Sequence, residues 1–259
     1  MMGSFNFFRL AGDYTHLAAL FTLLYGLWKS RNARTVSLRS QELYLGVYVM
    51  RYLDLMETGC NTSTHNLVFK VLFISITTAC VILIRFYSKD TWPRELDSGR
   101  WHLVFIPAVI YGLCGTASHG LFRSPWNRFI WLELFWSISQ GLEIFAIFPQ
   151  GWLIYKRQNG QGYVVAWLAL MFGYRLLYCL NWGYRNVTEN KFDHMSIFSG
   201  GTQVTVFLAI FLYTITVNKR RIRLNPEDND IEFAEFDPAH EEYAFLRASG
   251  GSAKGANIL

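Results

Sequence analysis

The chain has 259 residues, of which 52% are hydrophobic and 17% aromatic, and its formal net charge is +5. The hydrophobic residues form blocks close to the roughly 20 residues that cross a bilayer core, which excludes an ordinary soluble domain. The four cysteines lack metal-ligand spacing, and no phosphate-binding loop or nucleophile motif occurs, so the sequence predicts no enzyme, no metal site and no cofactor.

Seven apolar blocks predict an all-α integral membrane protein with seven transmembrane helices. In chain order the helices cover residues 14–28, 42–57, 67–86, 101–118, 127–148, 163–182 and 195–217. Lysine and arginine gather after the first, third, fifth and seventh helix. Because such residues stay on the cytosolic side, we expect a luminal N-terminus and a cytosolic C-terminus. This bias explains the net charge, so the expected partner is the lipid bilayer and not nucleic acid.

The blocks divide the chain into a membrane domain at residues 1–218 and a tail at residues 219–259. The tail runs through the acidic stretch Pro226-Glu227-Asp228-Asn229-Asp230 and ends rich in glycine, serine and alanine. Such a composition buries too little apolar surface to fold alone, so we expect a disordered cytosolic tail. Its few apolar residues leave open the alternative of a docking motif.

Polar side chains interrupt several predicted helices at spacings of three, four, seven or eleven, which place them on one helix face. An ionisable side chain in the bilayer costs at least about 2.5–3.5 kcal/mol, so these residues need a cavity, a partner or a ligand. In chain order they are Arg9, Asp13 and His16; Arg51 and Asp54; Glu133, Trp136, Gln140 and Glu143; and Tyr174, Tyr178, Trp182 and Arg185. Together they predict a polar cavity that opens toward the lumen.

The arginines of this cavity favour a ligand with several carboxylates, because the planar guanidinium binds a carboxylate through two parallel hydrogen bonds. Asp54 and Glu133 are suited to hold a cationic group of the same ligand. The alternative is that the charges only pair with each other, Arg51 with Asp54 or Arg175 with Glu143, and hold the bundle together. The aromatic residues taken singly are equally typical of packing.

Two parts of the sequence are weakly alike. Trp28-Lys29-Ser30-Arg31-Asn32 and the later Arg51 segment are similar to Tyr155-Lys156-Arg157-Gln158-Asn159 and the later Arg175 segment. Two three-helix bundles joined by a linker helix explain this similarity, and transporters built from parallel repeats place their ligand site at the repeat interface. Chance similarity between apolar segments is the alternative.

Taken together, these residues resemble the KDEL receptor family over about residues 5–218. The segments that carry the resemblance are Phe8-Arg9-Leu10-Ala11-Gly12-Asp13 with His16-Leu17, Trp28-Lys29-Ser30-Arg31, Arg51-Tyr52-Leu53-Asp54-Leu55, Leu142-Glu143 with Pro149-Gln150, and Tyr174-Arg175 with Tyr178, Asn181-Trp182 and Arg185. The resemblance implies a fold like that of the SWEET and PQ-loop transporters.

The resemblance also implies recognition, in the Golgi, of the luminal C-terminal KDEL/HDEL-type signal of escaped endoplasmic-reticulum proteins, and their return in retrograde vesicles. The protein would then lie in endoplasmic-reticulum and Golgi membranes. Arg51 would meet the terminal carboxylate, Arg9 the penultimate glutamate and Arg185 the aspartate, while Glu133 and Asp54 would hold the basic first residue. The full ligand-binding set implied is Arg9, Arg51, Tyr52, Asp54, Glu133, Trp136, Tyr174, Tyr178, Trp182 and Arg185.

His16 is the expected pH switch. An imidazole has an ordinary pKa of about 6.5 and responds to the step from a near-neutral endoplasmic reticulum to a more acidic Golgi. Protonation would favour the ligand-bound state by adding positive charge and rearranging contacts with Glu143, Tyr174 and Arg175. The alternative is a neutral, hydrogen-bonded core histidine.

Two features depart from the family pattern. The resemblance implies a membrane-proximal lysine that the retrograde vesicle coat reads, but here Lys219 is followed by arginines and a long acidic tail, where familiar members end soon after. On the last helix, Ala209 stands where familiar members carry an aspartate. These departures leave open a SWEET-like transporter of small solutes, or a divergent receptor relative that no longer sorts cargo.

Overall fold

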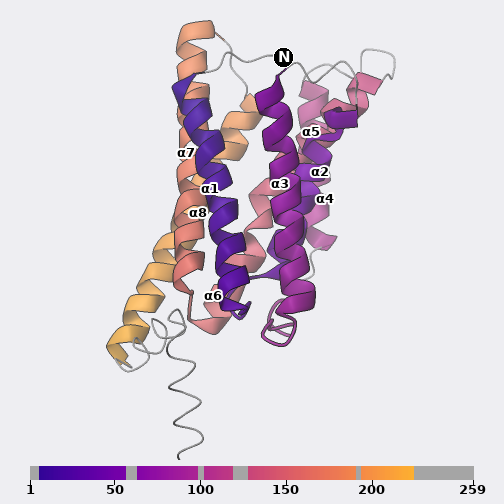
Figure 1. Cartoon of the computed structure of the whole chain (residues 1–259). Helices are drawn as coiled ribbons and strands as arrows, with labels where there is room; N and C mark the ends of the chain where they lie inside the picture. Colours follow the sequence, from indigo (N-terminus) through magenta and orange to yellow (C-terminus); the bar gives the residue numbers. More distant parts are fainter. Residues whose placement is uncertain (1–5, 57–62, 99–101, 119–127, 191–193, 225–259) are drawn as a thin grey trace, which may run out of the picture.

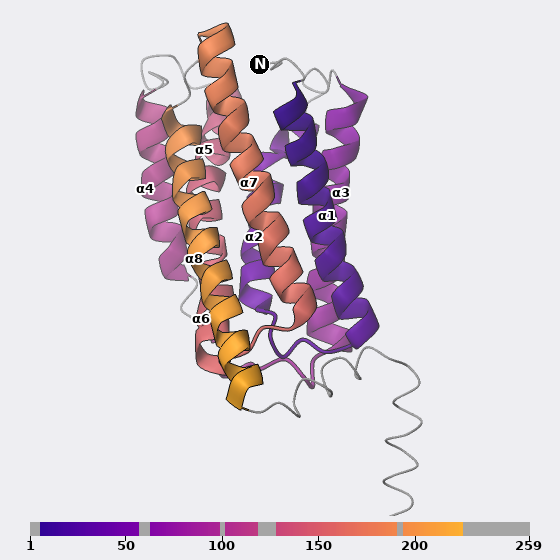
Figure 2. The same cartoon turned by 90° about the vertical axis from the view of Figure 1, so that its left-hand side faces the viewer.

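The computed structural model describes residues 6–56, 63–98, 102–118, 128–190 and 194–224. Within these ranges every regular element is a helix, and the helices lie side by side in one bundle (Figure 1, Figure 2). They are α1 (Phe7–Ser30), α2 (Leu38–Arg51), the 3-10 helix η1 (Leu53–Met56), α3 (Thr64–Ile82), the π-helix η2 (Leu83–Tyr87), α4 (His102–Ser118), α5 (Arg128–Ala146), α6 (Phe148–Arg157), α7 (Gly162–Glu189) and α8 (His194–Leu224). The all-α fold class is confirmed. We call the end of the bundle where α1 starts the Phe7 end, and the opposite one the Ser30 end.

Each predicted range overlaps one of the helical stretches, and the range 127–148 corresponds to α5. Among the described residues, four stretches are long and apolar enough to cross a membrane: Thr64–Tyr87, Ile130–Arg157, Gly162–Glu189 and His194–Arg223. A further apolar helix, Leu103–Ala117, is shorter. α1 and α2 are not among these stretches, and α2 has only 14 residues. The number of seven membrane spans therefore stays a prediction.

Several helices extend beyond the predicted ranges, by seven residues in α1, α7 and α8, and α7 ends at Glu189 and not at residue 182. α1 begins at Phe7 and not at residue 14, because the Asn6 side chain accepts a hydrogen bond from the Arg9 amide at 2.9 Å and caps the helix. α8 continues to Leu224, past the predicted end at residue 217, so Lys219 lies on a helix. The rest of the predicted tail, residues 225–259, lies outside the described residues.

One predicted helix, residues 42–57, is interrupted, and another helix, α6, follows the predicted end of the fifth helix. α2 ends at Arg51, and the chain continues through Tyr52 into η1. α5 ends at Ala146, and α6 starts at Phe148. Pro149 explains the break between α5 and α6, because proline lacks an amide hydrogen and is tolerated only in the first turn of a helix.

The helices pack as two similar halves. In the first half α1 and α2 both contact α3, and in the second half α5 and α7 both contact α8. Across the halves α1 lies against α7 and α2 lies against α5. Two three-helix units related by a twofold axis would give these same pairs, with α4 as the linker that packs on α5. The arrangement fits the predicted repeat.

At the Ser30 end, side chains of Gln150 and Asp97 form hydrogen bonds with the start of α2 and the residues before it. Gln150 Nε2 donates to the Thr35 carbonyl at 2.7 Å, and the Ser37 amide donates to Gln150 Oε1 at 2.8 Å. Ser37 Oγ donates to Asp97 at 2.5 Å, as does Trp92 Nε1 at 2.9 Å. Burial raises the pKa of the Asp97 carboxyl more than these bonds lower it. These contacts tie the start of α2 to α6 and so fix the register of the helices that carry the polar residues.

Candidate functional site

A buried ion cluster joins α2, α5 and α7. Glu143 of α5, whose side chain is 0% exposed, accepts a hydrogen bond at 2.6 Å from Arg51 Nη2 of α2. Its Oε1 forms an ion pair with Nη2 of Arg175 on α7. Tyr174 OH donates to the same oxygen at 3.1 Å and accepts from Arg175 Nη2 at 2.9 Å. We call these four side chains the Glu143 cluster.

The Glu143 cluster carries an excess positive charge, since it contains two guanidinium groups and one carboxylate. The Arg51 and Arg175 side chains are only 14% and 4% exposed. Nε of Arg175 is buried and has no hydrogen-bond partner within the described ranges. A buried charge is costly unless it is paired. The cluster is therefore suited to bind an anion, which would reach it beside the more exposed Arg51.

His16 of α1 is buried next to the Glu143 cluster. Its Nε2 lies 2.7 Å from Tyr48 OH, and its ring stacks on Tyr174 with centroids 4.1 Å apart and an interplanar angle of 9°. Phe73 of α3 covers the imidazole with a centroid distance of 4.4 Å. The structure thus brings together the four residues predicted for the pH switch, which are His16, Glu143, Tyr174 and Arg175.

One of the two predicted ion pairs is present and the other is wrong. Arg175 pairs with Glu143, which is one of the two pairs predicted if the charges only hold the bundle together. Arg51 does not pair with Asp54, because α2 ends at Arg51 and the three-residue spacing no longer places both on one helix face. Asp54 in η1 pairs instead with Lys70 of α3 at 2.5 Å.

Toward the Phe7 end, the polar residues of α1 and α7 face each other. Tyr178 of α7 donates a hydrogen bond to the Asp13 carboxylate of α1. The Tyr178 ring lies 6.1 Å from the Trp182 ring. Arg9 Nη2 donates to Asn66 Oδ1 of α3 at 3.2 Å. The first and last of the predicted polar stripes are therefore neighbours in space.

Three predicted ligand-binding residues lie apart from the Glu143 cluster. Arg185 Nε pairs at 3.1 Å with a glutamate one turn further along α7. Glu133 and Trp136 are half-buried on α5, and Glu133 has no ion pair or hydrogen bond within the part of the chain that the structure describes. Arg185 and Glu133 each lie ten residues, or about 15 Å along the helix, from the cluster residues of their own helices.

Sequence reasoning missed several residues that contact the predicted ones, among them Ser139, Tyr48 and Lys70. Arg51 Nε donates to Ser139 Oγ at 3.2 Å, and Tyr48 is the hydrogen-bond partner of His16. Lys70 holds Asp54, and its Nζ lies 5.7 Å from the centroid of the Tyr52 ring. Only Lys70 had a signal, because a lysine inside an apolar helix is costly and needs a partner.

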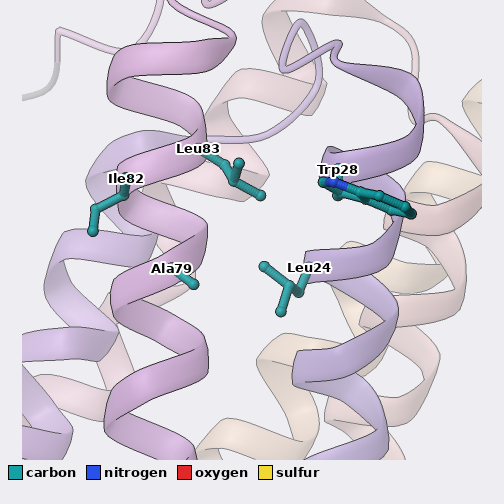
Figure 3. Close-up of a pocket in the computed structure, with 5 residues that line it drawn as sticks. All are labelled: Leu24, Trp28, Ala79, Ile82 and Leu83. Carbon is teal, nitrogen blue, oxygen red and sulfur yellow. The ribbon is translucent and has the colours of Figure 1, made fainter.

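An apolar groove lies elsewhere in the bundle, between α1 and the junction of α3 with η2 (Figure 3). Its volume is about 400 Å³, and it is lined by Leu24, Trp28, Ala79, Ile82 and Leu83. These residues lie toward the Ser30 end, away from the predicted polar stripes. The groove offers no charged group to a ligand, so we assign it no part in the candidate site.

Comparison with known proteins gives one consistent result. The family model described as ER lumen protein retaining receptor matches residues 32–185. An ER lumen protein-retaining receptor of Caenorhabditis elegans is 35% identical over 211 residues, which are 82% of this chain and 93% of that protein. The Drosophila melanogaster receptor is 35% identical over 82% of this chain and 94% of its own length. ER lumen protein-retaining receptor 2 of Gallus gallus is 34% identical with the same coverage.

Proposed function

Because the chain belongs to the ER lumen protein-retaining receptor family, we propose that it binds C-terminal Lys/His-Asp-Glu-Leu-type signals of luminal endoplasmic-reticulum proteins in the Golgi and returns them in retrograde vesicles. The family is one of receptors and not of enzymes. The names of the relatives describe retention of endoplasmic-reticulum luminal proteins. The choice of peptide, the dependence on pH and the transport route are our proposal for this chain.

The buried excess of positive charge is the observation that carries the proposal. Two guanidinium groups share one carboxylate in the Glu143 cluster, so one further anion would balance it. A peptide's terminal carboxylate is such an anion, and charge-assisted hydrogen bonds to arginine are about twice as strong as neutral ones. We assign the terminal carboxylate to Arg51, which is the more exposed of the two arginines.

The length of the polar region supports a peptide of about four residues. The predicted residues extend from the Glu143 cluster to Arg185 and Glu133, about 15 Å away along the helices. Four extended residues span about 13–14 Å. In this register Arg9 would meet the penultimate glutamate and Arg185 the aspartate, and each would exchange its present partner for the ligand.

The basic first residue of the signal needs an anion at the far end of the site. Glu133 is the better candidate, since it has no partner within the described residues. Asp54 already holds Lys70 at 2.5 Å, and a ligand cation would have to displace that lysine. Trp136, Tyr178 and Trp182 would supply the walls along the peptide, while Tyr52 and Tyr174 would lie beside its carboxylate end.

We assign the pH dependence to His16. Its ring is stacked on Tyr174, which donates to Glu143 and accepts from Arg175. A proton on the imidazole would add a second excess positive charge beside the Glu143 cluster and so favour an anionic ligand. A tenfold preference for the acidic compartment needs only about 1.4 kcal/mol of coupling between proton and peptide.

The sorting signal is assigned to Lys219. This exposed lysine lies near the end of α8. The residue before it, Asn218, forms hydrogen bonds with Gly160 in the connection between α6 and α7. In the proposed orientation this end faces the cytosol, where the vesicle coat would read the lysine. α8 packs on both α5 and α7, which carry most of the proposed ligand residues.

The test is binding of a labelled peptide ending in Lys-Asp-Glu-Leu to the purified protein at about pH 5.5 and about pH 7.2. The control is the same peptide with an amidated C-terminus. We expect at least about tenfold tighter binding at the acidic pH and loss of binding on amidation. Equal binding of the free and amidated peptides would refute the proposed carboxylate site. Absence of binding, together with uptake of a labelled dicarboxylic solute by proteoliposomes, would instead support a transporter.

A further inference from the structure

The apolar groove between α1 and the junction of α3 with η2 opens on the outside of the bundle, since Trp28 and Ile82 on its two walls are exposed. Leu24 of α1 and Leu83 of η2 point into the space between the two walls (Figure 3). The second wall belongs to Thr64–Tyr87, which is long and apolar enough to cross a membrane. In a bilayer the groove would therefore face the hydrocarbon chains of the lipids.

A π-helix, η2, ends this wall of the groove. The Ser88 amide donates to the Leu83 carbonyl at 2.8 Å and so closes the wide turn. Ile84 is fully buried, whereas Arg85, two residues beyond the groove residue Leu83, is exposed. π-helical turns are rare and occur frequently at functional sites. This turn places a guanidinium group just past the Ser30 end of an apolar groove.

Arg85 is one of two arginines that share a single carboxylate. Its Nη1 donates to Glu42 Oε1 of α2 at 3.1 Å, and Nη1 of Arg39 donates to Glu42 Oε2 at 2.8 Å. Nε of Arg39 is buried and has no hydrogen-bond partner among the described residues. Asp97 accepts from the amide of Arg39, in addition to its bonds to Ser37 and Trp92. We call Arg39, Glu42 and Arg85 the Glu42 cluster, which carries one uncompensated positive charge.

The neighbouring charges, as far as the structure describes them, do not cancel this excess. Residues 29–42 contain four basic residues and one acidic residue, and residues 85–98 contain three of each. Lys29 lies in the last turn of α1, directly after the groove residue Trp28. α6 and the last turns of α8 add only basic residues at the same end. The described part of the Ser30 end is therefore positively charged, and an anion is the ligand that complements it.

We propose that the groove and the Glu42 cluster together bind one anionic phospholipid. An acyl chain would lie in the groove, and the phosphate would meet Arg85. Arginine binds phosphate through strong charge-assisted hydrogen bonds, and basic pockets at the ends of membrane helices bind anionic headgroups. Exposed Trp28 and Tyr87 are typical of the membrane–water boundary, where a headgroup lies. In the proposed orientation the lipid comes from the cytosolic leaflet, which is the leaflet rich in anionic lipids.

The test of the charged part measures binding of labelled phosphatidylserine and of labelled phosphatidylcholine to the purified full-length protein in neutral detergent. We expect phosphatidylserine to bind about fivefold or more tightly, and Arg85→Gln to lose most of this preference. Arg157→Gln, which removes another exposed arginine at the Ser30 end, is the control and should bind phosphatidylserine within about twofold of the wild type. Equal binding of the two lipids by the wild type, or equal losses in both variants, would overturn the proposal.

The test of the groove uses Ala79→Leu, which fills the groove and changes no charge. We expect this variant to bind phosphatidylserine about fivefold or more weakly, because acyl methylene groups kept out of the groove no longer contribute to binding. Ala209→Leu, at an exposed alanine of α8, should bind like the wild type, since α8 packs on α5 and α7 and lines no part of the groove. Unchanged binding by Ala79→Leu would show that no chain occupies the groove.

Two further results would each overturn the proposal. If inorganic phosphate bound as tightly as phosphatidylserine, the site would be one for free phosphate. If Ala79→Leu changed the oligomeric state and not lipid binding, a second copy of the chain would occupy the groove. The proposal is independent of the peptide site, so a wild type that bound phosphatidylserine and no peptide would refute the proposed function alone.

Discussion

At the scale of single residues, Glu143 has the largest role in the candidate site. It is fully buried, and it contacts Arg51, Arg175 and Tyr174 from two other helices. Its carboxylate both stabilises the bundle and leaves one positive charge uncompensated. The polar residues that hold the protein together and those that would hold the ligand are therefore partly the same.

Replacing Glu143 by glutamine removes the charge and keeps the shape. Arg51 and Arg175 would then lie buried without an anion, and breaking such a pair costs about 3–5 kcal/mol. We expect a large fall in the melting temperature of Glu143→Gln in detergent. Glu133→Gln is the matched control on the same helix, since Glu133 has no partner within the described residues and its loss should alter only peptide binding. Equal melting temperatures for the two variants would contradict the role given to Glu143.

Much of the candidate site could be predicted from the sequence, because charged residues are rare in membrane helices and stand out. The charges of Arg51, Glu143 and Arg175 do meet in one cluster. The partner of Asp54 could not be predicted from helical spacing, because α2 ends at Arg51. No glycine or proline near Arg51 indicates this helix end. Hydrogen-bond partners such as Ser139 could not be predicted from the sequence either, because pairing between helices depends on how they pack and not on the periodicity of polar residues.

At the scale of helices, the close approach of α4 and α5 positions the proposed acidic residues. A Cβ atom added at Gly112 of α4 would lie 2.8 Å from the Cα atom of Ile138 on α5, which is too close for either backbone to stay in place. Small residues allow such contacts between membrane helices. α5 carries Glu133 and Glu143, so the glycine indirectly sets where these carboxylates stand.

Gly112→Ala should therefore push α4 away from α5. Overpacking of this kind costs about 1–3 kcal/mol, which should lower the melting temperature. Gly183→Ala on α7 is the control, because nothing lies within 4 Å of its added Cβ, and there alanine should stabilise the helix by about 0.5–1 kcal/mol. If both substitutions changed the melting temperature in the same direction, the close packing of α4 on α5 would not explain the effect.

At the scale of the whole molecule, the two halves pack through matching pairs, α1 with α7 and α2 with α5. The Glu143 cluster contains residues of α2, α5 and α7, and His16 of α1 stacks on it, so the site lies where the halves meet. α8 packs on α5 and α7, so it lies next to two of the helices that carry the site. The sequence indicated the repeat only weakly, because the packing pairs that reveal it join segments far apart in the chain.

This arrangement would separate the proposed ligand site from the proposed sorting signal. The proposed ligand residues lie toward the Phe7 end, whereas Lys219 lies near the last turns of α8 at the Ser30 end. We expect Lys219→Ser to bind the Lys-Asp-Glu-Leu peptide within about twofold of the wild type, because no ligand residue contacts this end. In cells lacking their own receptor, the same variant should let a reporter ending in Lys-Asp-Glu-Leu escape into the medium. Lys156→Ser, which changes another exposed lysine at the same end, should still retain the reporter. If both variants retained it equally well, the retrograde coat would have to read a different part of the chain.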